Sequence, residues 1–461
     1  MTLAAQVESE TADAIAGRPS DVLHADALIH LCLMAAITFG CFQGWLKDRI
    51  AGPLPYALSD GFLLAAAALW FASVVILRYP LLVAPARTAV DLLLVALVFA
   101  PMLYLFAPGT PLLIELAGLR AWSAFPVAAM IALSILRTSG QLRAYVVLVL
   151  TLCIITGAYG IWQYAAGPEL ALATPLGQER HGSSVFFEIS GTGAVETDFR
   201  AFSTFAYPAP FAAMMTFGLV LCGAIATSRN RSRKQRLLAL ALMPLFFVAM
   251  TVSGTRAALI MTVVGLGVVA WYRGFRMRYF VLLIPAIIAV HIATVLTSGR
   301  AARRFLSLLV QEGLLWSYVT SPIRTAWSAL GEHWFGLGLG RTGTGVPFAI
   351  ASSMPPGYFV FSDGDIGRAA IELGIVGLML LAFVVFGLIP RAAAAARRLK
   401  DGADDDVAIG TAALILSGSL TILIGSPLSA TPHAIIWWFF FGALLKLQIL
   451  REHQNQTDSV N

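Results

Sequence analysis

Residues 144–166 read AYVVLVLTLCIITGAYGIWQYAA, an unbroken apolar stretch without a single charged side chain. About 20 such residues are enough for a helix to cross the hydrocarbon core of a bilayer. Similar runs recur along the whole chain of 461 residues, of which 58% are hydrophobic and only 12% charged. This composition excludes a soluble protein. It predicts a membrane protein built from helices, because a helix satisfies its own backbone hydrogen bonds in lipid.

The apolar runs predict an all-α polytopic membrane protein with about twelve transmembrane helices and a large, partly helical outer loop between helices nine and ten. The expected helices lie near residues 27–45, 61–77, 88–107, 121–136, 144–166, 203–227, 237–252, 257–271, 279–297, 366–389, 407–426 and 432–448. The four cysteines all fall inside these helices and are expected to be ordinary apolar residues.

Basic residues gather at every second connection, which assigns that side to the cytoplasm and places both termini there. The basic connections are 78–87, 137–143, 228–236, 273–278 and 391–400. They account for most of the net charge of +6, so this charge does not indicate nucleic-acid binding. The acidic run DGADDD (401–406) lies on the same side and is expected to be a solvated loop.

The predicted order of segments follows from these assignments. It comprises a cytoplasmic tail (1–26), helices one to nine (27–297) with an outer segment at 167–202, a large outer loop (298–365), helices ten to twelve (366–448) and a second cytoplasmic tail (449–461). Loops this long in compact folds are usually functional or disordered.

The large outer loop carries five arginines and has helical patterning of its own. Its stretch RFLSLLVQEGLLWSYV (304–319) is apolar on much of its surface, so we expect it to lie along the membrane interface. A second, short helix is expected to follow, with Ser321 as its N-cap and Pro322 at its first position.

Further arginines occupy the other outer segments, although basic residues usually favour the cytoplasmic side. The guanidinium group is planar, stays charged and matches phosphate oxygens with a fork of donors. Arginines from several outer segments could therefore converge on a lipid-linked pyrophosphate. Alternatively, individual arginines pair with lipid headgroups or with acidic side chains of the outer loops. The candidate ligands are Arg120, Arg180, Arg200, Arg256, Arg324, Arg341 and, in the first turn of helix ten, Arg368.

Four local patterns occur in order along this part of the chain. They are RAFSTFAYPAPFAA (200–213), TVSGTRAALIM (251–261), RTAWSALGEHWFGLGLG (324–340) and SDGDIGRAAIELGIVGL (362–378). Together with the helix count and loop placement, they resemble the O-antigen polymerase/ligase superfamily of integral membrane glycosyltransferases. The resemblance covers most of the chain from about Arg120 to Gly377.

The sequence departs from the family pattern at two points. Pro208 is followed by Ala209, where family members often have asparagine. Asp363 and Gly364 stand where ligase-type members usually have a His-Asn pair, eleven residues before Gly374. An aspartate can accept the same proton as the histidine, so this departure favours the polymerase branch over the ligase branch.

The resemblance implies a periplasmic active site on the bacterial inner membrane that acts on undecaprenyl-pyrophosphate-linked glycans. Arg200, Arg256 and Arg324 are then expected to bind the pyrophosphate, and Asp363 to accept the proton of the attacking sugar hydroxyl. Asp365 and His333 are alternative bases. Two of these residues have purely structural alternatives. Asp363 would then cap helix ten, and Arg256 would anchor a helix end at the membrane interface.

The implied partners are the lipid-linked glycan donor, a glycan or lipid acceptor, membrane lipids and other polysaccharide-assembly proteins. No cofactor or metal is expected, because the arginines supply the positive charge that a divalent ion supplies in other transferases. An O-antigen ligase that uses a lipid A core acceptor is the alternative within this class. A twelve-helix transporter or lipid flippase is the alternative of another class.

Overall fold

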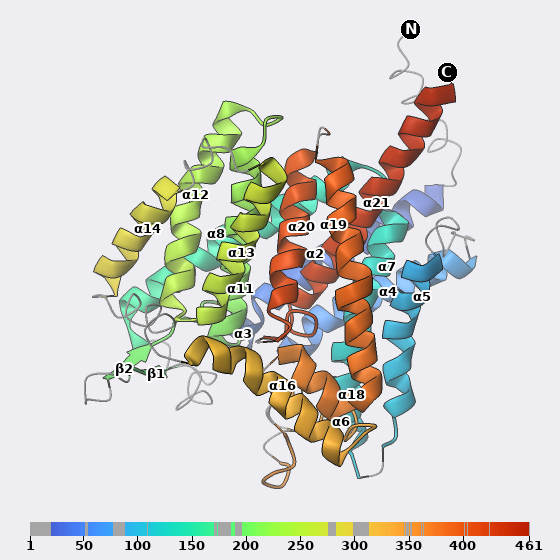
Figure 1. Cartoon of the computed structure of the whole chain (residues 1–461), viewed down its shortest axis with the longest axis vertical. Helices are drawn as coiled ribbons and strands as arrows, with labels where there is room; N and C mark the ends of the chain where they lie inside the picture. Colours follow the sequence, from blue (N-terminus) through green and yellow to red (C-terminus); the bar gives the residue numbers. More distant parts are fainter. Residues whose placement is uncertain are drawn as a thin grey trace.

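The computed structural model places nearly all of the described chain in helices, which form one bundle (Figure 1). The description covers residues 20–50, 54–76, 88–107, 109–169, 173, 186–189, 196–274, 283–297, 313–344, 346, 350, 353–360, 362, 364–400, 402, 404–423 and 425–460. Two short strands, β1 (Phe186–Ile189) and β2 (Glu196–Phe199), pair antiparallel at one end of the bundle, a feature that the sequence did not predict.

Nine helical segments of the described chain are long and apolar enough to cross a membrane. They lie in α2 (Ser20–Cys41), α4 (Leu54–Ile76), the continuous α6 (Leu112–Leu119), η3 (Arg120–Ala124) and α7 (Phe125–Ile135), α8 (Ser139–Ala166), α11 (Pro208–Thr227), α12 (Arg233–Val252), α13 (Arg256–Arg273), the continuous α18 (Gly364–Ala382), η5 (Phe383–Leu388) and α19 (Ile389–Leu399), and α21 (His433–Val460). The prediction of a multi-pass helical membrane protein is thus confirmed.

The predicted number of twelve spanning helices is not confirmed. Each of the twelve expected segments contains a helix, but in three of them the part that the structure describes is shorter than a bilayer requires. These helices are α5 (Thr88–Phe99), α14 (Leu283–Leu296) and α20 (Asp405–Leu420), with 12, 14 and 16 residues. The other short elements are α3 (Gln43–Lys47) and η2 (Ala100–Tyr104).

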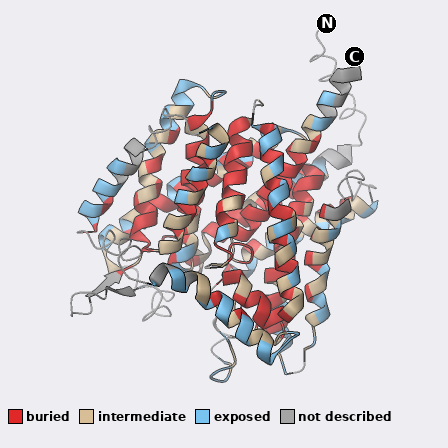
Figure 2. Cartoon of the chain, in the orientation of Figure 1, coloured by how far each residue is buried: buried red, intermediate tan, exposed pale blue. Residues whose placement is uncertain are grey.

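The first part of helix α21 is buried in the bundle, where α21 packs against α7, α19 and α20. Its aromatic run WWFFF (437–441) is buried on every side, and Figure 2 shows buried residues concentrated through the middle of the molecule. A helix that is apolar all round is found in a protein core or in lipid, and here neighbouring helices bury it. The four cysteines are buried and free, as expected for apolar core residues.

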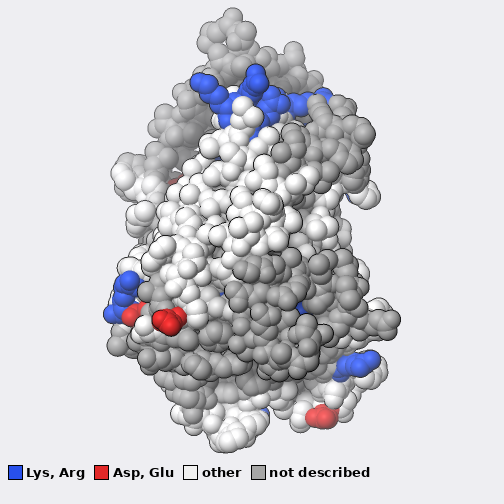
Figure 3. Space-filling model, turned by 90° about the vertical axis from the view of Figure 1, so that its left-hand side faces the viewer, with Lys and Arg blue, Asp and Glu red and all other residues white. Residues whose placement is uncertain are grey.

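Lysines and arginines gather at one end of the molecule (Figure 3). At this end the acidic run is not solvated as predicted, because Asp405 and Asp406 are only 2% and 3% exposed. Asp405 pairs with Arg273, which ends α13, and Asp406 accepts two hydrogen bonds from Arg231 at 2.9 and 3.0 Å. We call these pairs the acidic clamp. The prediction failed because the clamp's basic partners lie more than 130 residues away in the sequence.

The clamp makes a testable contribution to stability. Replacing Asp405 with alanine would leave the guanidinium of Arg273, 7% exposed, buried without its partner. We expect the free energy of unfolding to fall by about 3–5 kcal/mol, measured by unfolding in detergent. Glu452→Ala is the matched control. Its pair with Arg398 is 46–63% exposed, so a loss of about 0–1 kcal/mol is expected. Equal losses in the two variants would contradict a buried clamp.

Helix α16 (Leu314–Glu332) crosses the bundle obliquely at the opposite end (Figure 1). It begins after Gly313, so the predicted start at Ser321 is wrong, and Pro322 lies inside the helix. An internal proline costs one backbone hydrogen bond. Here Pro322 is buried, and α16 packs against α18, so tertiary packing offsets this loss. The residues before 313 that were predicted to lie along the membrane interface are outside the described residues.

Candidate functional site

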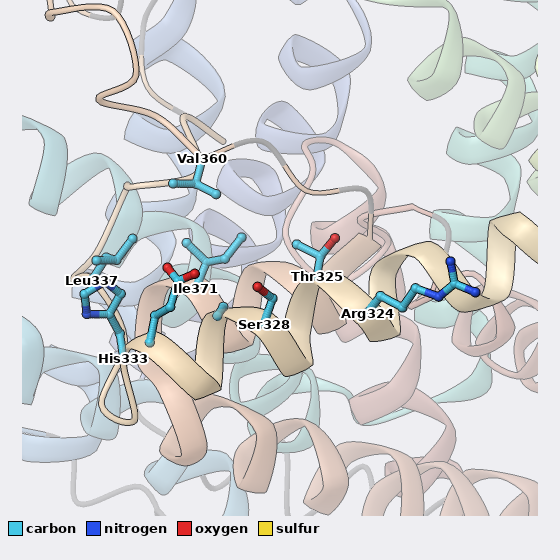
Figure 4. Close-up of a pocket in the computed structure, with 9 residues that line it drawn as sticks. Arg324, Thr325, Ser328, His333, Leu337, Val360 and Ile371 are labelled. Atoms are coloured by element: carbon cyan, nitrogen blue, oxygen red, sulfur yellow. The ribbon is translucent and has the colours of Figure 1, made fainter.

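A cavity of about 470 Å³ lies along one side of α16 (Figure 4). Its walls come from α16, from the glycine-rich turn that follows it, from α18 and from the segment near residue 360. The lining residues are Arg324, Thr325, Ser328, Ala329, Glu332, His333, Leu337, Val360 and Ile371. A cavity of this size lies within the range of small-ligand sites, and it offers one guanidinium, two hydroxyls, a carboxylate and an imidazole.

The turn over residues 334–342, which we call the glycine turn, docks on a break in α18. The backbone of α18 leaves the helical conformation at Gly374, where φ is 60° and ψ is −138°. The carbonyl groups released by this break accept hydrogen bonds from the turn. Leu337 N–H donates to Ile371 at 2.7 Å, and Gly338 N–H donates to Glu372 at 3.1 Å. In return, Ile375 N–H donates to Trp334 at 2.9 Å.

This docking requires glycine at two facing positions. Gly336 has a φ of 78°, and a Cβ atom there would lie 2.6 Å from the carbonyl oxygen of Glu372. A Cβ atom on Gly374 would collide with the backbone of Trp334 and Gly336. Glycine tolerates these conformations and leaves room for the close approach, so the turn can lie tightly against α18.

Gly374→Ala is therefore expected to destabilise the protein and to displace the cavity wall. The unfavourable backbone conformation alone costs about 1–3 kcal/mol, and the collision adds to it. Gly331→Ala, within α16, is the control because nothing lies within 4 Å of the added methyl group. Thermal unfolding in detergent should show a lower midpoint for Gly374→Ala and an unchanged or slightly higher one for Gly331→Ala. A wild-type midpoint for Gly374→Ala would contradict this account of the turn.

Glu372 holds the same turn through its side chain. Its Oε1 atom accepts a hydrogen bond from the hydroxyl of Thr342 at 2.5 Å, and its Oε2 atom accepts one from Trp122 Nε1 at 2.7 Å. Arg368 Nη2 lies 3.2 Å from the same Oε2, with the guanidinium 4.9 Å from the Trp122 ring centre. The Arg368 side chain is 1% exposed, so this predicted ligand is buried in a structural network beside the cavity and does not line it.

Arg200 and Arg256 lie together at the start of α13. The Nε atom of Arg200 donates to the carbonyl of Ser253 at 3.0 Å, and its Nη2 donates to the hydroxyl of Thr255 at 3.0 Å. Arg256 is the first residue of α13, directly after this turn. Arg200 thus fixes the turn that carries Arg256. Neither residue lines the cavity beside Arg324.

The other predicted ligands have separate surroundings. Arg120 forms an ion pair with Asp60 at 2.9 Å. Arg341 stacks on Tyr358, 4.0 Å from the ring centre, and its carbonyl accepts a hydrogen bond from Val360 N–H at 2.9 Å. Arg180 and the predicted base Asp363 lie outside the described residues. Among the candidate arginines that the structure describes, Arg200 and Arg256 lie together and the others lie in separate surroundings.

The alternative base Asp365 is fully buried and fully engaged. Its two carboxylate oxygens accept hydrogen bonds from Leu428 N–H at 3.0 Å and from the hydroxyl of Ser429 at 2.7 Å. It fastens the start of α18 to the connection between α20 and α21. His333, the other alternative, lines the cavity. Sequence reasoning did not select Thr325, Ser328 or Glu332; their spacing on the same helix as Arg324 was the signal that could have found them.

No known protein-family model matches the sequence, and no curated protein is significantly similar to it. Among the residues that the structure describes, no group of three or more His, Cys, Asp or Glu side chains could hold a metal ion.

Proposed function

We propose that the chain is a membrane glycosyltransferase that polymerises oligosaccharide repeat units carried on undecaprenyl pyrophosphate. The reaction takes place at the end of the bundle away from the basic loops, on the periplasmic face of the bacterial inner membrane. The observation that carries the proposal is the cavity beside α16. Arg324, Thr325 and Ser328 all line it, and their guanidinium and hydroxyl groups suit a diphosphate joined to a sugar.

The proposed reaction is a direct displacement at the anomeric carbon of the donor glycan. The oxygen of an acceptor hydroxyl forms the new bond to this carbon, while the bond to the pyrophosphate oxygen breaks. Arg324 stabilises the negative charge that grows on the leaving pyrophosphate. The acceptor proton passes to Asp363. Direct displacement inverts the anomeric configuration and is proposed to proceed without a metal ion.

The remaining outer arginines have supporting roles in this proposal. Arg200 and Arg256 contribute positive charge from the start of α13. In this proposal they contact a part of the donor that lies outside the cavity. Arg120, Arg180 and Arg341 stay predicted contributors to substrate binding, whereas the buried Arg368 supports the site only through its pair with Glu372. An acceptor that is another lipid-linked glycan makes the protein a polymerase, whereas a lipid A core acceptor would make it an O-antigen ligase.

Asp363→Asn tests the base directly. The amide keeps the size of the side chain but cannot accept the acceptor proton, so glycan extension should fall by about 100- to 10,000-fold. The length distribution of the product glycans measures this change, and size-exclusion behaviour shows whether the variant inserts and folds. Products of near-normal length would remove Asp363 from the reaction and move the base to Asp365, to His333 or to no residue at all.

The class of activity is tested with the purified protein in liposomes. Undecaprenyl-pyrophosphate-linked repeat units are supplied. The products are then separated, and longer glycans and released lipid pyrophosphate are quantified. Both products are expected. One lipid pyrophosphate should be released for each new glycosidic linkage. The absence of turnover with any lipid-linked glycan, together with measurable solute or lipid movement across the membrane, would favour a transporter or flippase.

A further inference from the structure

Helix α16 carries a stripe of large apolar side chains that no part of the described chain covers. Trp316, Ile323 and Trp327 are 68%, 45% and 79% exposed. They are seven and four residues apart, and these spacings place side chains on one face of a helix. Exposed residues of this size in contiguous patches usually mark a surface that contacts lipid or another protein.

The stripe and the cavity lie on opposite faces of the same helix. Successive residues of a helix are turned by about 100°, so Thr325 lies roughly 200° from both Ile323 and Trp327. Thr325, Ser328 and Glu332 line the cavity. Arg324 follows Ile323 directly and therefore lies at the edge between the stripe and the cavity. Helix α16 thus has one apolar face and, on its opposite side, a polar face that lines the cavity.

The nature of the surrounding surface indicates what covers the stripe. Other large exposed aromatic residues occur where helices end at this side of the bundle. Phe106 follows η2 and is 78% exposed, Trp162 lies in the last turns of α8 and is 53% exposed, and Tyr207 precedes α11 and is 49% exposed. Tryptophan and tyrosine concentrate at the boundary between hydrocarbon and headgroups. Figure 1 shows α16 at this same end of the bundle.

We propose that α16 lies in the outer membrane–water interface, with Trp316, Ile323 and Trp327 in contact with lipid. The cavity behind it then receives its ligand sideways from the bilayer. The ligand class is an amphiphile whose anionic headgroup meets Arg324 at the edge of the helix while its hydrocarbon chain stays along the apolar stripe. Arginine suits this edge because its stem covers apolar surface while its charged end stays among polar groups. The lipid contact is independent of the proposed function, whereas the sideways route of the donor rests on it.

Site-directed spin labelling in liposomes tests the lipid contact. Single cysteines are introduced by Ile323→Cys and Trp327→Cys on the stripe, and by Ser353→Cys in an exposed segment as the aqueous control. The four native cysteines are buried, and labelling of the unmodified protein measures their background. Collision of the label with oxygen, which concentrates in hydrocarbon, is compared with collision with a neutral nickel chelate, which stays in water. Retained elution volume shows that each variant is folded.

Oxygen is expected to dominate at positions 323 and 327, and the nickel chelate at position 353. Ile323→Cys removes less volume than the tryptophan change, so it keeps the test informative if the larger change disturbs folding. Dominance of the nickel chelate at both stripe positions would overturn the proposal, because the stripe would then face water. A lipid-facing stripe in a protein without glycan turnover would overturn the proposed function alone, and turnover with an aqueous stripe would overturn this inference alone.

Discussion

Replacing Arg324 with alanine is expected to lower the rate of glycan extension by about 100- to 1,000-fold. Arg324 lines the cavity and no lysine or other arginine is among the lining residues, so its removal leaves the cavity without this cation. Because the charge on the leaving pyrophosphate grows as the glycosidic bond breaks, the loss should fall mainly on kcat. The measurement is the rate of lipid pyrophosphate release by the purified variant in liposomes at saturating donor.

Two further variants make this result specific. Arg324→Lys keeps the charge but loses the planar fork of donors, so an intermediate rate is expected. Arg391→Ala removes an exposed arginine on α19, far along the chain from the site, and should leave the rate unchanged. A wild-type rate for Arg324→Ala would exclude Arg324 from the pyrophosphate site. Equal losses for Arg324→Ala and Arg391→Ala would indicate a general effect of surface charge.

Replacing Glu372 with alanine is expected to cost about 3–5 kcal/mol of stability, because it leaves the buried guanidinium of Arg368 without its partner. The same change removes the acceptor for Trp122 Nε1 and for the hydroxyl of Thr342. The glycine turn would keep its backbone hydrogen bonds to α18 but lose its side-chain attachment at Thr342, which loosens this wall of the cavity. Unfolding in detergent measures the stability. The donor concentration at half-maximal rate should rise, because a loosened cavity wall weakens donor binding.

The double variant Arg368→Met/Glu372→Leu is the control for this prediction. It removes both charges and replaces them with apolar groups of similar volume, a change that buried ion pairs often tolerate. Stability should recover by several kcal/mol relative to Glu372→Ala, while the attachment of Thr342 stays lost. Equal stability of Glu372→Ala and the wild type would show that the pair is not buried as the structure has it.

The bilayer made much of the fold predictable, and tertiary contacts account for the rest. Each apolar run became a helix because lipid leaves the backbone no other partner. The sequence could not show that α20 stops at Leu420, since the next residues, TILI (421–424), are as apolar as the helix. The backbone of this connection instead accepts hydrogen bonds from the start of α18. Sequence reasoning also misread Asp405, whose partners Arg273 and Ser228 come from distant helices. Likewise, packing of α16 on α18 decides that Pro322 stays inside a helix.

The candidate site was predictable in its residue types and less so in its arrangement. Arg324 was selected because arginine on an outer loop suggests an anionic ligand, and it does line a cavity. The resemblance grouped Arg200, Arg256 and Arg324 at one pyrophosphate, whereas the first two lie together at the start of α13. Which outer segments meet depends on how the helices pack. Arg368 shows the same limit, because its position in a helix did not reveal that Glu372 and Trp122 enclose it.

The central claim is that the cavity beside α16 holds the pyrophosphate of a lipid-linked glycan. The most direct test is photocrosslinking with a non-hydrolysable undecaprenyl diphosphate analogue that carries its photoreactive group next to the phosphates. Mass spectrometry of the digested protein then locates the attachment. We predict crosslinks within α16 and the glycine turn, strongly reduced in Arg324→Ala and competed by unlabelled lipid-linked glycan. Crosslinks that map elsewhere, or that persist unchanged in Arg324→Ala, would contradict the claim.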